Sequence, residues 1–256
     1  MNVHVLIFPT QHPFAYSTHP NSYSMCFNYT MKSIKFRLSL LFLLLISKSF
    51  ITESKCTKTC DLALASYNIQ KGSNLTYISS IIMKSKVVSK PEDIFSYNND
   101  TLQSPDSLLV DSRVNVPFPC DCINDEFLGH TFLYEIHRGD TYASIAEFTF
   151  SNLTTKKSIK RDNDYSPDNI PVDGTLNVTV NCSCGNREVS KDYGLFITYP
   201  LSPKDTLESI AKDTKLDAEL LQRYNPSVNF SQGIGLVFIP GKDKNGVYVP
   251  LPSSPR

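Results

Sequence analysis

The hydrophobic and polar positions of the chain follow a pattern that recurs with an offset of 65 residues. Residues 134–146 read YEIHRGDTYASIA and residues 199–211 read YPLSPKDTLESIA, so a tyrosine, an Asp-Thr pair and a Ser-Ile-Ala run recur in step. A fainter copy begins at Tyr67, where Gly72 corresponds to Gly139. A period of this length indicates one supersecondary unit that is used three times.

Each copy is predicted to run strand, helix, helix, strand. The Asp-Thr pair offers an N-cap to the first helix, and Asp205 followed by Glu208 has the capping-box spacing. A second helix is predicted at residues 216–224, before the proline of Asn225-Pro226 stops it. The strands are predicted at residues 132–136 and 196–199 before the helices, and at residues 114–118, 176–180 and 236–239 after them.

This order predicts an α+β fold of three small βααβ modules, in which two antiparallel strands pack against a helix pair. We place the modules at residues 61–119, 130–181 and 195–241, followed by a tail at residues 242–256.

Six cysteines fall into three close pairs that separate the modules. Two cysteines at positions i and i+2 of a strand cannot bridge without severe strain, so each must reach another segment. Eight connectivities remain, and all of them link each pair to both others. A disulfide framework of this kind implies an oxidising compartment. The pairs are Cys56 and Cys60, Cys120 and Cys122, and Cys182 and Cys184.

The start of the chain indicates export. Residues 31–54 read as a signal peptide with a positively charged beginning and a nine-residue apolar run at residues 38–46, which is too short to span a bilayer. Residues 1–30 fit no signal peptide and are interpreted as an upstream extension absent from the mature chain. Cys26 lies in this extension, so an even six thiols would remain.

Composition narrows the classes of partner. The chain has 25 Lys plus Arg and 25 Asp plus Glu, which argues against a nucleic-acid partner and makes neutral ligands more plausible. After the signal segment, no stretch is long and apolar enough for a transmembrane helix. Sequons suited to a glycosylated extracellular surface occur at Asn74, Asn99, Asn152, Asn177 and Asn229, and a sixth, at Asn181 beside Cys182, is the least suited to modification.

The βααβ unit with Asp-Thr after its first strand resembles the LysM carbohydrate-binding module. Three such modules, separated by Cys56-x-x-x-Cys60, Cys120-Asp-Cys122 and Cys182-Ser-Cys184, resemble the ectodomain of plant LysM receptor-like kinases, in the branch of chitin-elicitor and Nod-factor receptors. The phrases Pro117-Phe-Pro-Cys-Asp-Cys122 and Leu221-Gln-Arg-Tyr-Asn-Pro226 carry the same likeness. The resemblance implies the bridges Cys56–Cys122, Cys60–Cys184 and Cys120–Cys182.

The resemblance also implies a function. It implies that the second module binds N-acetylglucosamine oligomers, as chitin fragments or lipochitooligosaccharides, between the turn after its first strand and the loop before its second. The residues carried over are Arg138, Gly139, Asp140, Thr141, Ala143, Lys156, Pro167, Asp168, Asn169 and Ile170. Relatives can have an acidic side chain where Ala143 stands, which weakens the expectation for plain chitin. It implies no cofactor, no catalytic residue and, as partner, another LysM receptor protein at the cell surface.

Other interpretations remain open. Asp140-Thr141 and Asp205-Thr206 can serve mainly as helix caps. Three of the five histidines precede Met31, which argues against a zinc site. The chain could be a secreted decoy that scavenges chitin fragments, or the non-catalytic module of a cell-wall hydrolase. An acyl chain could be recognised by the first module, around residues 74–78 and 84–86.

Overall fold

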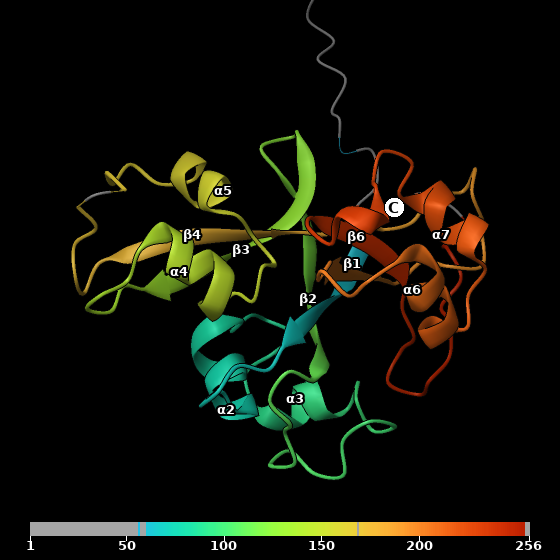
Figure 1. The fold of residues 1–256 in the computed structure, drawn as a ribbon, viewed down its shortest axis with the longest axis horizontal. Helices are drawn as coiled ribbons and strands as arrows, with labels where there is room; N and C mark the ends of the chain where they lie inside the picture. Colours follow the sequence, from blue (N-terminus) through green and yellow to red (C-terminus); the bar gives the residue numbers. More distant parts are fainter. Residues whose placement is uncertain (1–55, 57–59, 168, 254–256) are drawn as a thin grey trace, which may run out of the picture. The chain divides into compact units, whose positions relative to one another are not determined.

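A computed structural model describes Cys56, residues 60–167 and residues 169–253. The chain divides into two units, Met1–Glu53 and Ser54–Arg256, and the description concerns the second (Figure 1). The predicted signal peptide at residues 31–54, the extension at residues 1–30, Cys26 and Asp168 lie outside the described residues.

Three strand–helix–helix–strand modules follow one another, as the sequence predicted. The first contains β1 (Cys60–Asn68), α2 (Leu75–Tyr77), the π-helical turn η1 (Ile78–Ile82), α3 (Pro91–Phe95) and β2 (Arg113–Ile123). The second contains β3 (Phe127–Glu135), α4 (Tyr142–Ser144), the π-helical turn η2 (Ile145–Thr149), α5 (Lys156–Arg161) and β4 (Thr175–Asn181). The third contains β5 (Phe196–Pro200), α6 (Leu207–Thr214), α7 (Ala218–Tyr224), the 3₁₀ turn η3 (Phe230–Gln232) and β6 (Leu236–Pro240).

All six strands form one sheet in the order β4-β3-β2-β1-β5-β6. The two strands of each module pair antiparallel. Between modules, β2 pairs antiparallel with β3, and β1 pairs parallel with β5. The sequence predicted the pairs within modules but not this continuity. Strand β2 therefore extends beyond the predicted residues 114–118, since residues 121–123 pair with residues 127–129 of β3.

Two apolar cores lie against this sheet. One is shared by the first and second modules and includes Tyr67, Phe118, Phe132 and Leu176, all buried. The other belongs to the third module and is centred on Leu221. The third module thus has a core of its own, and it joins the first through strand pairing, the Leu64 side chain beside Gly241 and the Arg113 guanidinium over the Tyr199 ring.

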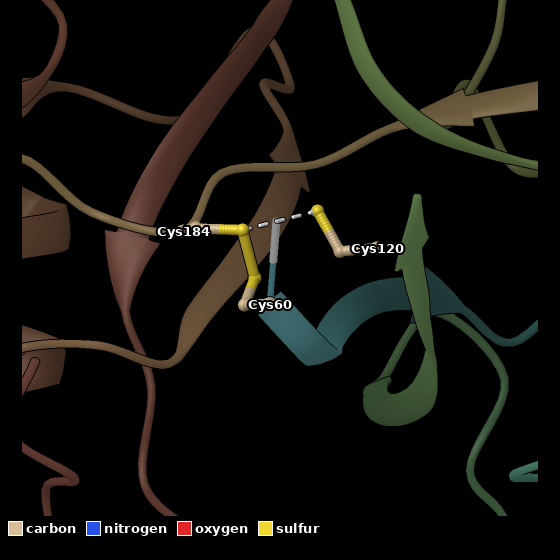
Figure 2. Close-up of side chains that lie close together, drawn as sticks. All are labelled: Cys60, Cys120 and Cys184. Carbon is tan, nitrogen blue, oxygen red and sulfur yellow. Dashed lines mark hydrogen bonds between the residues drawn. A yellow bond between two sulfur atoms is a disulfide. The ribbon is translucent and has the colours of Figure 1, made fainter. Parts of the chain in front are cut away.

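Three disulfides join the segments between modules. They connect Cys56 to Cys122, Cys60 to Cys184 and Cys120 to Cys182, the same pairs that the resemblance implied. Figure 2 shows that two bridges meet, because the sulfur of Cys184 lies 3.6 Å from that of Cys120. Neither sulfur carries a hydrogen, so this is a packing contact and not a hydrogen bond.

The Asp-Thr pair caps α6 as predicted, but the predicted capping box of α6 and the predicted first residue of α7 are wrong. The N-cap of α6 is Thr206, whose hydroxyl accepts from the Ser209 N–H, and not Asp205 with Glu208 as the capping-box partner. Helix α7 begins at Ala218 rather than 216, because Asp217 caps it by accepting from the Leu220 N–H at 2.9 Å.

Candidate functional site

A tight turn after β3 is held by the carboxylate of Asp140. Its Oδ2 accepts from the His137 N–H at 2.7 Å and from the Tyr134 hydroxyl at 2.9 Å. The Asp140 N–H in turn donates to the His137 carbonyl. Burial of the phenol and the neighbouring Asp140 carboxylate raise the pKa of Tyr134 well above its usual value. Asp140 therefore fixes the turn, and its inner oxygen is already occupied.

The residue after Asp140 starts the first helix. The Thr141 hydroxyl accepts from the Ser144 N–H at 3.0 Å, and the Ser144 hydroxyl accepts from the Thr141 N–H at 2.9 Å. The interpretation of Asp140-Thr141 as a helix cap is thus correct for Thr141, while Asp140 braces the turn before it. The third module repeats this division, since Asp205 accepts from the Ser202 N–H at 2.7 Å.

The tip of the turn presents backbone to solvent. Gly139 has φ of +93°, a region that side-chain-bearing residues rarely adopt, and a Cβ built there would meet no atom within 4 Å. Arg138 and Gly139 are exposed, and within the described residues their N–H groups have no hydrogen-bond partner. These two donors are therefore open to a ligand or to water.

A second loop, at residues 162–174, lies beside this turn and is fastened to it at two places. The Tyr142 hydroxyl, on a side chain that is otherwise buried, donates to the Tyr165 carbonyl at 2.9 Å. On the other side, the Ile136 N–H donates to the Gly174 carbonyl at 2.8 Å. These contacts fix the spacing of the two loops that the sequence predicted as the walls of a sugar-binding site.

The remaining predicted residues occupy three kinds of position. Asn169 is exposed at the tip of the second loop, and its N–H donates to the Ser166 carbonyl at 3.0 Å. Ile170 is half-buried against the shared core, and in the described part of the chain its backbone N–H has no partner. Pro167 and Ala143 are half-buried, and Lys156 is exposed at the first position of α5.

Family models and a solved structure match this disulfide-linked chain of three modules. The family description "LysM domain" matches residues 197–240, and "LYK3/4/5 LysM2 domain" matches residues 127–180. The crystal structure of the LYK3 ectodomain shares 50% sequence identity with a TM-score of 0.74, over 77% of this chain and 98% of that one. This chain belongs to the LysM receptor-like kinase family.

Curated relatives agree with this LysM assignment. Chitin elicitor receptor kinase 1 of Arabidopsis thaliana is 46% identical over 228 residues, which is 86% of this chain and 36% of the relative. LysM domain receptor-like kinase 3 of Medicago truncatula is 49% identical over 214 residues, 83% of this chain and 34% of the relative. The chain thus spans about a third of these relatives and corresponds to the part whose solved structures are ectodomains.

The sequence shows an asparagine after the second helix, but its role could not be predicted from the sequence. The asparagine after each second helix has a side-chain amide that joins the helix to the last strand of its module. Asn225 donates to the carbonyls of Leu221 and Phe238, both at 2.9 Å, and accepts from the Phe238 N–H at 2.7 Å. Asn98 and Asn163 make the same three bonds in the other modules. The recurrence of this asparagine near the second helix end is the signal that could have identified it.

Two further sets of predicted residues can be placed. The sulfurs of Cys60, Cys120 and Cys184 lie within 4.8 Å of one another, but all three belong to disulfides and offer no thiolate to a metal. The five predicted glycosylation sites, Asn74, Asn99, Asn152, Asn177 and Asn229, all have exposed side chains. Among the described residues, no helix is long and apolar enough to cross a membrane.

Proposed function

We propose that the chain is the extracellular part of a cell-surface receptor and that its second module binds N-acetylglucosamine oligomers without cleaving them. The observation that supports this proposal is that, within the described residues, the backbone N–H groups of Arg138, Gly139 and Ile170 have no hydrogen-bond partner. These groups lie on two loops that are fastened to each other. Acetamide and hydroxyl oxygens of such a sugar accept hydrogen bonds from donors of this kind. The names of the relatives, which include a chitin elicitor receptor kinase, support the choice of sugar.

The comparison of modules supports the second as the binding site. Offset by 65 residues, the third module has Pro203 where the second has Arg138, and proline carries no backbone N–H. The first module keeps the open glycine, since Gly72 has φ of +87° and a Cβ there would meet nothing within 4 Å. The sequence of the first module differs most from the other two, around residues 74–78 and 84–86, and for that reason it is the candidate for reading an acyl chain in a lipochitooligosaccharide.

Calorimetric titration of the secreted protein with a chitin oligomer and with its acylated form tests the proposal. Ile170→Asp places a charge beside the open N–H donors and should weaken binding of the chitin oligomer at least about tenfold, or roughly 1.4 kcal/mol. Val247→Asp is the matched control, because Val247 is an exposed valine in the tail and the substitution adds the same charge. Binding of neither ligand to the folded wild type would refute the proposal.

The same titrations distinguish the two ligand classes. If the second module alone reads the sugar, Ile170→Asp weakens both ligands equally. If the first module reads an acylated ligand, that ligand should retain its affinity for the variant. In either case we propose that the receptor signals by recruiting a second LysM receptor protein. When the two ectodomains are mixed, the sedimenting mass should then increase only in the presence of ligand.

A further inference from the structure

Two of the three disulfides are in contact with each other. The sulfurs of Cys120 and Cys184 belong to different bridges, and they lie 3.6 Å apart (Figure 2). A disulfide bond is about 2.05 Å long, so an approach of about 1.5 Å would bring these two sulfurs to bonding distance. The contact therefore places the two bridges where they can exchange partners.

The backbone around the contact is regular on one side and irregular on the other. Cys120 lies on β2, where it is paired with Cys60 of β1. Cys184 lies between β4 and β5, in a segment without regular secondary structure. A shift of this segment can bring Cys184 closer to Cys120 without breaking the pairing of strands.

The four cysteines of the two touching bridges differ in their access to solvent. Cys60 is half-buried, while Cys120 is only 1% exposed. Cys182 and Cys184 are each 5% exposed. In thiol–disulfide exchange a thiolate bonds to one sulfur of a bridge and displaces the other, and access helps to decide which sulfur is attacked. An external thiol should therefore attack Cys60 and displace Cys184.

We propose that these two bridges form a redox-sensitive relay. A small external thiol of the glutathione class opens the Cys60–Cys184 bridge, and Cys120 then exchanges its bond to Cys182 for a bond to Cys184. The result is a Cys120–Cys184 bridge and a free thiol at Cys182. This inference is independent of the proposed receptor function.

Both steps are ordinary thiol–disulfide exchanges. In the first, the external sulfur bonds to Cys60, the Cys60–Cys184 bond breaks, and its electron pair makes Cys184 a thiolate. In the second, this thiolate bonds to the Cys120 sulfur, and Cys182 leaves as a thiolate that takes a proton from water. The external thiol is oxidised to a mixed disulfide, one protein disulfide is reduced, and the second step involves no net oxidation.

The exchange moves a cross-link from one module boundary toward the next. Before it, Cys120 is bonded to Cys182, which directly follows β4, so the bridge holds the end of the second module. After it, the bridge holds the segment that leads to the third module. The end of β4 would then rely on its pairing with β3 and on the hydrogen bond from the Cys182 N–H to the Leu128 carbonyl at 3.1 Å.

Differential alkylation of the full secreted chain tests the proposal. The folded protein is exposed to glutathione, its free thiols are blocked with a first alkylating label, and the remaining bridges are reduced and blocked with a second. Fragment mass spectra then place each label. The first label should appear on Cys182 at least about fivefold more often than on Cys120, because exchange keeps Cys120 in a bridge. Absence of the first label from Cys182 overturns the proposal, as does equal labelling of Cys120 and Cys182, which direct reduction of their bridge would give.

A variant starts the second step without any reductant. Cys60→Ser leaves Cys184 as a free thiol beside the Cys120–Cys182 bridge, and the first label should then reach Cys182 in at least roughly one molecule in ten. Cys60→Ser/Cys184→Ser is the matched control, because it keeps the Cys120–Cys182 bridge and removes the attacking thiol, so Cys182 should stay unlabelled. A first label confined to Cys184 in Cys60→Ser, or equal labelling of Cys182 in both variants, contradicts the proposal.

Discussion

At the scale of single residues, the asparagine after the second helix of each module makes three hydrogen bonds that no apolar side chain could make. Asn225, the buried one in the third module, can be tested: Asn225→Ala leaves the backbone groups of Phe238 and Leu221 without these partners, so we expect a loss of about 3 kcal/mol in unfolding free energy. Guanidinium unfolding of the disulfide-intact protein measures this loss. Asn245→Ala, in an exposed turn of the tail, should change the free energy by less than about 0.5 kcal/mol. Equal effects of the two variants would contradict this role for Asn225.

Tyr67 links the first two modules and should make stability depend on alkaline pH. Its hydroxyl donates to the Thr149 carbonyl at 2.8 Å, and burial raises the pKa of Tyr67 from 10.0 to about 12. Because the folded state holds this proton more tightly, the stabilisation is complete below pH 10 and is lost as pH rises from 10 to about 12.

Tyr67→Phe removes this dependence and one hydrogen bond. We expect it to lower the unfolding free energy at neutral pH by about 1 kcal/mol and to make the decline above pH 10 shallower, while the share due to Tyr134 and Tyr199, whose pKa values burial also raises, remains. Denaturant unfolding at several pH values measures both effects. Tyr165→Phe, which removes an exposed phenol, should keep the wild-type free energy at neutral pH. An unchanged alkaline decline in Tyr67→Phe would show that other groups cause it.

Residue identity alone predicted less about Asp140 than about Gly139. An open glycine with positive φ follows from the need for a tight turn, and the structure has it at Gly139. The role of Asp140 depends on the hydroxyl of Tyr134, six positions earlier on β3, and on the backbone of His137. Those contacts exist only once the strand and the turn are folded together, so the Asp-Thr pair read by itself resembled a helix cap.

At the scale of elements, the N-cap of α6 can be tested by substituting Thr206 and Glu208 one at a time. Thr206→Ala removes the hydroxyl that accepts from the Ser209 N–H, and should cost about 1 kcal/mol. Glu208→Ala removes the side-chain acceptor that the predicted capping box with Asp205 requires, and should cost less than about 0.5 kcal/mol. Denaturant unfolding of both variants decides between the alternatives, and a larger effect of Glu208→Ala would favour the predicted box.

The strands were easier to predict than their order in the sheet. Alternation of apolar residues located the two predicted strands that precede helices, and β-rich composition located the three that follow them. The parallel pairing of β1 with β5 joins residues 64–65 to residues 197–198, more than 130 positions apart, and no local pattern encodes it.

At the scale of the whole described unit, two separate cores imply two units of cooperative opening. The third module shares no apolar cluster with the others, so its hydrogen-bonded amides can open while the shared core stays closed. The disulfides end at Cys184, before β5 begins, so none of them restrains this opening directly.

Leucine-to-alanine substitutions in each core test this arrangement. Leu221 and Leu176 are both fully buried, one in each core, and removal of either side chain should cost about 2–5 kcal/mol in the unit that contains it. In native-state hydrogen exchange, Leu221→Ala should speed exchange within residues 196–240 alone, because the shared core does not use that side chain. Leu176→Ala should speed exchange in the first and second modules together, although Leu176 belongs only to the second. Exchange that rises in the second module alone would mean that the first two modules open separately despite their common cluster.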